Sequence, residues 1–267
     1  GLLALNVSSL TGSQVNYLST SQIGNLLTTQ VRSLLGTTIS LLSTSNLNAL
    51  SSAQFQALTT AQISNLKTQQ ISNIEEADLQ ALNSIQLQAI TQESIAALTT
   101  ASLNALATDK LASLSLIQIA ALKTSQISSL DISKLQGISR SQFGALSAAQ
   151  FNSLSSAQIS NILTSQINAI SGLKIAGIDT SALNSLTSTQ FQSLNTAAMG
   201  SLTTAQINNL ELEDVKSITT SQIASLTGAQ LSALSAIQIE NLQTLQLRAL
   251  TVNQVSNLSS TKLNALS

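Results

Sequence analysis

The chain has 267 residues, of which 43% are hydrophobic and only 8% are charged, and its formal net charge is −1. It contains no Cys, His or Trp and very few aromatic side chains. This composition excludes disulfides, imidazole catalysis and the common zinc sites, and it provides neither a basic surface nor stacking platforms for nucleic acid. No apolar run is long enough for a membrane span, and no cofactor is expected.

A repeat of eight residues runs through the whole chain without insertion or deletion. Every eighth residue from Leu2 to Leu266 is Leu or Ile, and another apolar residue follows five positions later, from Val7 to Leu263. Arrays with a fixed short period grow by stacking repeats and not by enlarging one core. We therefore predict a single continuous array over residues 1–267, either a segment of a longer array or the subunit of a filament.

The first octads already carry a helix-capping pattern. With the Leu or Ile as position one, position two is usually Ser, Thr, Asp or Asn and position five is most often Gln, as in Ser19 and Gln22 and again in Thr203 and Gln206. In such a capping box the hydroxyl accepts from the N–H three residues on, and Gln reaches back to the N–H of the cap residue. Each octad therefore predicts one short helix, from position three to position eight.

Apolar positions one and six are the predicted core. Their spacing alternates between five and three, which suits neither a half-buried strand nor a continuous helix, whose apolar stripe would turn by roughly 80° per octad. We predict an all-α solenoid of very short capped helices forming an elongated rod, with a β-solenoid as the alternative. Handedness and the number of octads per coil stay open. The residues chosen to represent the core are Leu58, Ile63, Leu66, Leu122, Ile127, Leu202 and Ile207.

Some octads depart from the pattern. Where Leu occupies the cap position, we expect the cap to move one residue later, as at Thr28 and Thr164. Small residues at positions four and eight should let neighbouring helices approach closely. Lys134 and Lys174 at position five should replace Gln on the surface. Bulky residues at position four are expected to thicken the core locally, and these are Ile85, Ile117, Leu173, Ile237 and Leu245.

Two groups of charged residues invite a functional interpretation. Glu211, Glu213 and Asp214 could bind Ca²⁺ through hard oxygen ligands, but no glycine turn accompanies them, so we prefer a solvated charged coil. Lys67 and Glu75 occupy the same position in successive octads. We expect neighbouring coils to bring them together as a weak surface ion pair.

The Leu-Thr-Thr-x-Gln-Ile pattern of 202–207 and 218–223 resembles octad arrays in very large bacterial secreted and cell-surface proteins, some of them adhesin-like. The resemblance covers essentially the whole chain and implies an extracellular or cell-surface location. The Gly-Gly-x-Gly-x-Asp nonapeptides of calcium-binding β-rolls are absent, so their calcium site is not implied.

No nucleophile–base pair supports catalysis, so we do not expect an enzyme. Our first hypothesis is a structural protein that forms an extracellular fibre, stalk or surface filament by end-to-end or lateral association with itself. Other cell-surface or matrix components could be further partners. The alternative is an adhesin or ice-binding module that presents regular rows of Ser and Thr, although helix capping already accounts for those residues.

Overall fold

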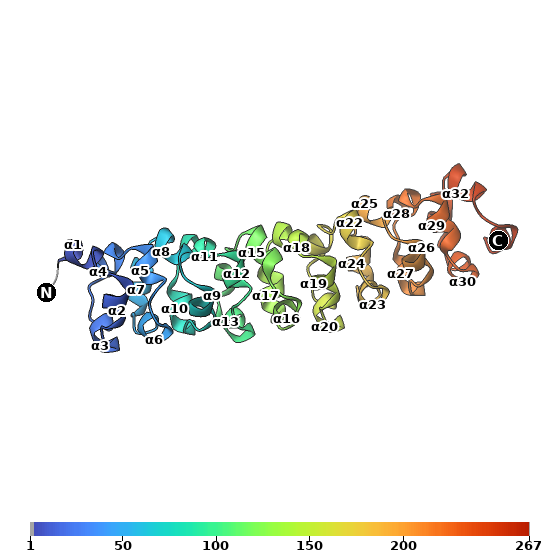
Figure 1. Ribbon diagram of the computed structural model, residues 1–267. Coiled ribbons are helices and arrows are strands. Elements are labelled where there is room, and N and C mark those ends of the chain that lie inside the picture. Colours follow the sequence, from blue (N-terminus) through green and yellow to red (C-terminus); the bar gives the residue numbers. More distant parts are fainter. Residues whose placement is uncertain (1–2, 267) are drawn as a thin grey trace. The chain divides into compact units, whose positions relative to one another are not determined.

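The computed structural model describes residues 3–266, which form a succession of short helices joined by bends (Figure 1). This range contains 33 α-helices of four to six residues and no strand. The all-α prediction is thus confirmed, and the β-solenoid alternative is wrong for these residues. The chain divides into two compact units, Gly1–Ile138 and Ser139–Ser267, and each is a helical solenoid.

One helix forms in nearly every octad, at the same place in the repeat. The helices of the first unit are α1 (Ala4–Ser8), α2 (Gly12–Asn16), α3 (Thr20–Gly24), α4 (Thr28–Ser33), α5 (Gly36–Ile39), α6 (Thr44–Leu47), α7 (Ser52–Ala57), α8 (Thr60–Ser64), α9 (Thr68–Ser72), α10 (Glu76–Ala81), α11 (Ser84–Ala89), α12 (Gln92–Ile95), α13 (Thr100–Ala105), α14 (Thr108–Ala112), α15 (Leu116–Ala121), α16 (Thr124–Ser128) and α17 (Ile132–Gly137). Those of the second unit are α18 (Arg140–Ala145), α19 (Ala148–Asn152), α20 (Ser156–Ser160), α21 (Thr164–Ile167), α22 (Gly172–Ile175), α23 (Thr180–Leu183), α24 (Ser188–Gln192), α25 (Thr196–Met199), α26 (Thr204–Asn208), α27 (Leu212–Ser217), α28 (Thr220–Ser225), α29 (Gly228–Ala233), α30 (Ala236–Glu240), α31 (Thr244–Arg248), α32 (Val252–Ser256) and α33 (Ser260–Asn264).

The capping box starts most of these helices. In α8 the Thr59 hydroxyl accepts from the N–H of Gln62 at 3.2 Å, and the Gln62 Oε1 accepts from the N–H of Thr59 at 2.8 Å. The same reciprocal pair joins Ser19 to Gln22 and Thr203 to Gln206. A helix this short is unstable alone in water, because nucleation is costly, so neighbouring coils must hold it in place.

The expected one-residue movement of the cap is wrong. Where Leu takes position two, the helix still begins at the next residue, and Leu27 and Leu163 are extended N-cap residues. Half of the capping box survives, since the Leu27 N–H donates to the Gln30 Oε1 at 2.7 Å. Position five alone can therefore fix the start of the helix.

The chain turns once in just over three octads. Helices three apart pack against each other, as α1 does on α4 and α21 on α24. Side-chain hydrogen bonds between coils join residues 25 to 31 positions apart, as from Asn104 to Ser129 and from Gln62 to Val31. These separations lie between three and four octads, so one turn of the coil takes slightly more than three octads. The eight-residue period alone does not reveal this number.

Positions one and six form the continuous core of each unit. Among the residues chosen above, exposure is at most 4%: it is 3% for Leu58, Leu122 and Leu202, 4% for Leu66, 1% for Ile63 and zero for Ile127 and Ile207. Position four faces away from this core. The bulky residues there are therefore not core, contrary to our expectation, because their side chains are 61% to 96% exposed.

Close approach between coils involves position eight, as expected, but its partner is position three and not position four. Leu41, a bulky residue at position eight, lies where a Cβ on Gly12 would stand. In the opposite arrangement, Gly137 at position eight faces Thr108 at position three. The two positions lie across one turn of the coil and complement each other in size. No helix in the described part of the chain is long and apolar enough to cross a membrane.

Candidate functional site

The side chain at position five connects successive coils, and Gln62 illustrates how. Its Oε1 accepts from the cap residue of its own octad, while its Nε2 donates to the main-chain oxygens of Val31 at 2.9 Å and Leu34 at 2.6 Å. The residue is only 2% exposed. A buried amide group is stable only when its donors and acceptors are satisfied, and here both ends of the amide are used.

The acceptors occupy a fixed place in the repeat. They are the main-chain oxygens 31, 30 and 28 positions before the position-five residue, and we call them the carbonyl cradle. Gln86 donates to all three, Phe55, Gln56 and Leu58, at 3.0, 3.2 and 2.7 Å. The same cradle receives the amide of Gln222 in the second unit.

Other donors reach the cradle in several octads that lack Gln. The Thr38 hydroxyl donates to Leu10 O at 3.2 Å. At Ala198, which has no polar side chain, the Nδ2 of the cap residue Asn195 donates instead to Asn168 O and Ile170 O, both at 2.9 Å. Those two oxygens belong to the cradle of Ala198, so here the donor comes from another position of the octad.

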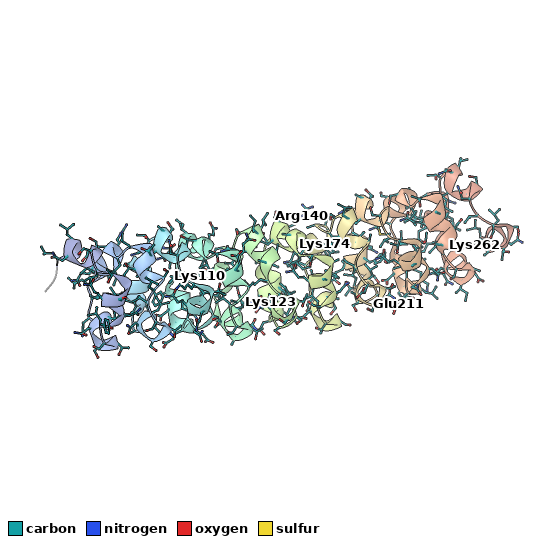
Figure 2. The ribbon with its side chains drawn as sticks, viewed as in Figure 1. Lys110, Lys123, Arg140, Lys174, Glu211 and Lys262 are labelled. Carbon is teal, nitrogen blue, oxygen red and sulfur yellow. The ribbon has the colours of Figure 1, made fainter. Side chains whose placement is uncertain are left out.

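Four lysines place their ammonium groups in cradles. Lys110 donates to Leu82 O, Lys134 to Leu106 O, and Lys262 to Ser232 O, while Lys174 donates to Gly144 O and, at 3.3 Å, to Phe143 O. Lys110, Lys174 and Lys262 are labelled in Figure 2. Lys134 and Lys174 thus replace Gln, as expected, but each is only partly exposed, and its ammonium group contacts main-chain oxygens of the preceding coil instead of lying free on the surface. Burial lowers the pKa of Lys174 to about 8, because removal from water disfavours the charged form.

Two position-five residues, Asp78 and Asp214, differ chemically from all these donors. Their side chains are only 4% and 5% exposed. Burial raises the pKa of Asp78 to about 6, the Glu75 carboxylate adds to the rise, and a hydrogen bond from Ser52 opposes it. Burial likewise raises the pKa of Asp214 to about 6. An ionised carboxylate can only accept hydrogen bonds, so it cannot fill a cradle of oxygens.

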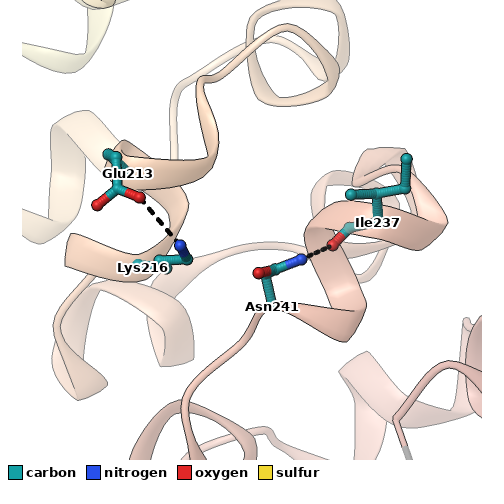
Figure 3. A network of polar contacts seen from close by, with 4 residues as sticks. All are labelled: Glu213, Lys216, Ile237 and Asn241. Carbon is teal, nitrogen blue, oxygen red and sulfur yellow. Dashed lines mark hydrogen bonds and ion pairs between the residues drawn. The ribbon is translucent and has the colours of Figure 1, made fainter.

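The acidic residues singled out in the sequence do not form one carboxylate site. Glu213 is exposed and pairs with Lys216 at 2.9 Å (Figure 3), whereas Asp214 is buried. The carboxylates of Glu211 and Glu213 act on Asp214 by raising its pKa. Within residues 3–266 no three Asp, Glu, His or Cys side chains are grouped to hold a metal ion.

Two smaller observations complete the polar contacts. The expected pair of Lys67 and Glu75 does not form, since the Glu213–Lys216 pair is the single ion pair of the described residues. Residues one octad apart follow each other along the coil, and contacts across it need a much larger separation in sequence. Asn241 at position eight closes its helix by donating to Ile237 O at 2.8 Å (Figure 3).

The cradle was missed in the sequence because the capping box already accounts for Gln at position five. One signal was present. Glu is an equally good partner in a capping box, yet no octad has Glu at position five, and Gln, Lys and Asn recur there. The absence of Glu, together with the frequent donors, points to a second, buried contact for the side chain.

Comparison with known proteins supports the repeat architecture. The pattern of the ALTTAQ repeat family matches residues 39–68 and 207–244, one segment in each compact unit. No curated protein matches the chain. The chain is therefore similar to ALTTAQ repeats over these two segments, consistent with an array of short repeats.

Proposed function

We propose that this protein is a structural array that forms an extracellular or cell-surface fibre or stalk. The observation that carries the proposal is the cradle contact, which attaches most octads to octads three and four places earlier. Because the contact follows the repeat and not a special end, it can be continued by any octad in the same register. Such an array provides length and stiffness, and it requires no catalytic group.

Self-association can use the contact that already joins the coils. A position-five donor of one copy would meet the carbonyl cradle of another, as Gln62 meets the main-chain oxygens of Val31 and Leu34 within one chain. Head-to-tail contact between copies joins such unlike surfaces. Gln14 and Gln22 are exposed position-five residues, whereas Gln62 in the same position is buried.

Sedimentation velocity and electron microscopy of the purified chain test this proposal. We expect end-to-end oligomers that grow with protein concentration. Gln14→Glu combined with Gln22→Glu keeps the capping box but replaces two exposed donors by carboxylates, and it should abolish the oligomers. Gln69→Glu, an exposed change at position four, is the matched control and should associate like the unaltered chain.

Separate particles at every concentration, or identical association of both variants, would contradict the self-association. A monomer that showed thermal hysteresis would instead favour the ice-binding alternative. The hydroxyl groups argue against that alternative, because those of Thr59 and Ser19 already accept hydrogen bonds from their own helices. An adhesin would require binding of a separate surface component by the monomer.

A further inference from the structure

All the buried side-chain atoms that lack a hydrogen-bond partner in the described residues belong to two places in the array. They are the Oδ1 atoms of Asn48 and Asn184 and the Oδ2 atom of Asp214. Unpartnered buried polar atoms call for an explanation such as a bound ion.

Both asparagines belong to the cradle of an aspartate. Asn48 precedes Asp78, and Asn184 precedes Asp214, by the same separation at which Gln56 O accepts from Gln86. In the register of the cradle, Asn48 and Asn184 therefore each contribute one main-chain oxygen. Their unpartnered side-chain oxygens lie on the same residues.

Other asparagines in the same position of the octad have a partner. The Oδ1 atoms of Asn104 and Asn152 accept from the N–H groups of Asp131 and Asp179 on the following coil, at 3.0 Å each. The buried Oδ1 atoms of Asn48 and Asn184 lack such a bond. Oxygen atoms without donors accumulate where the position-five residue is an aspartate.

The two places are copies of each other. Asn48, Glu75 and Asp78 of the first unit recur in the second unit, with identical spacing, as Asn184, Glu211 and Asp214. The combination of Glu at position two with Asp at position five occurs in no other octad. Both sets therefore combine features that are absent elsewhere.

The cradle already binds positive charge in other octads, since the ammonium groups of Lys110, Lys134, Lys174 and Lys262 donate to it. An aspartate at the same position supplies the opposite charge and no cation of its own. A free cation in the cradle would replace the missing ammonium group and neutralise the carboxylate.

The length of the side chain leaves room for such an ion. The Gln62 Nε2 lies 2.6 to 2.9 Å from its closest cradle oxygens, and Asp is one methylene, or about 1.5 Å, shorter than Gln. A carboxylate at position five would thus stand about 4–5 Å from those oxygens. Ca²⁺ binds oxygen ligands at about 2.3–2.6 Å, so an ion midway between the two would contact both.

We propose that Asp78 and Asp214 each form a binding site for a hard divalent cation, with Ca²⁺ the best fit. The ligands would be the aspartate carboxylate, the cradle oxygens and the Oδ1 of Asn48 or Asn184. Such a site takes ligands from coils one turn apart, so the ion fastens those coils together. This proposal does not depend on the proposed function, because it concerns coils within each unit.

Isothermal titration of the chelator-treated full chain with CaCl₂ at pH 7.5 tests the proposal. We expect two ions per chain and a Tm that rises by about 3 °C or more in millimolar Ca²⁺. Asp78→Gln and Asp214→Gln, which install the usual donor, should each remove one ion. The double variant should bind none and should melt above the unaltered chain when no Ca²⁺ is present.

Asp109→Asn is the matched control, because it removes an exposed carboxylate at position four and should keep both ions. Circular dichroism confirms that every variant retains its helices. The proposal is overturned if the unaltered chain binds no Ca²⁺, if NaCl of equal ionic strength raises the Tm as much, or if the double variant still responds to Ca²⁺. The double variant could also be more stable than the unaltered chain while the unaltered chain binds no Ca²⁺. That result would mean that a protonated Asp carboxyl group occupies the cradle, and it would also refute the cation site.

Discussion

Gly137 lies against Thr108 so closely that a Cβ on residue 137 would overlap the Thr108 Cγ2. The contact joins position eight of α17 to position three of α14, one coil away. We expect Gly137→Ala to destabilise the first unit by about 1–3 kcal/mol through overpacking. Thr108→Ala removes the Cγ2 and should restore most of this loss in the double variant. Chemical unfolding of the four proteins as a double-mutant cycle measures the coupling.

One outcome of the cycle would contradict this interpretation. A coupling energy near zero would mean that the two coils separate without cost and that positions three and eight are not complementary. Gly12 and Leu41 form a second contact of this kind. Gly12→Ala should destabilise the first unit, and Leu41→Ala should compensate for it in the double variant.

Buried and exposed copies of position five should respond differently to the same substitution. Gln62→Ala removes the capping bond and three cradle bonds and leaves the buried Leu34 oxygen without a donor, so we expect a loss of about 2–4 kcal/mol. Gln14→Ala, at an exposed copy, removes the capping bond and should cost about 1 kcal/mol or less. Equal losses in urea unfolding would show that the cradle contributes nothing to stability.

Much of this fold follows from local rules. The helix start is fixed by residues three apart, as Ser19 and Gln22 are, and such contacts can be inferred from one octad. The core at Leu58 and Ile63 follows from apolar spacing in the same way. The cradle could not be inferred, because Gln62 and Val31 are 31 residues apart, and the number of octads per turn depends on how helices pack.

Our wrong prediction for the bulky position-four residues has the same cause. Without the coil repeat, Ile85 and Ile117 could lie on either side of a short helix, and their apolar character favoured the core. The structure gives the inward face to positions five and six, so position four, about 100° away around the helix, is left to solvent. The sequence shows that residues 78 and 214 are aspartates. Only the number of octads per turn, which the structure provides, places their carboxyl groups near the cradle oxygens.

Core and solvent positions can be distinguished by introducing the same charge at each. Leu122→Asp places an unpaired carboxylate at a site that is 3% exposed, and we expect a loss of several kcal/mol. Ile117→Asp in the same helical region alters a side chain that is 61% exposed and should change stability by about 0.5 kcal/mol or less. Thermal unfolding followed by circular dichroism compares them. A Leu122→Asp protein that melts like the unaltered chain would remove position one from the core.

Lys174 should give the stability of the second unit a distinctive dependence on alkaline pH. Its pKa in the folded chain is lowered to about 8 from the ordinary 10.5 by burial. Below pH 8 the ammonium group is charged in both the folded and the unfolded chain, and its desolvation cost is fully present. Between pH 8 and 10.5 the folded chain has lost this proton while the unfolded chain still holds it, so stability rises with pH in this window.

Lys174→Gln isolates that effect, because Gln is the usual neutral donor to the cradle. At pH 7 the variant should be the more stable protein, and its advantage should shrink by about 1–2 kcal/mol by pH 10, the group being only partly buried. Urea unfolding of both proteins at pH 7, 8.5 and 10 measures the difference, in which titration of the other lysines and Tyr17 cancels. A constant difference across this range would mean that Lys174 keeps its ordinary pKa and that its ammonium group is well solvated in the cradle.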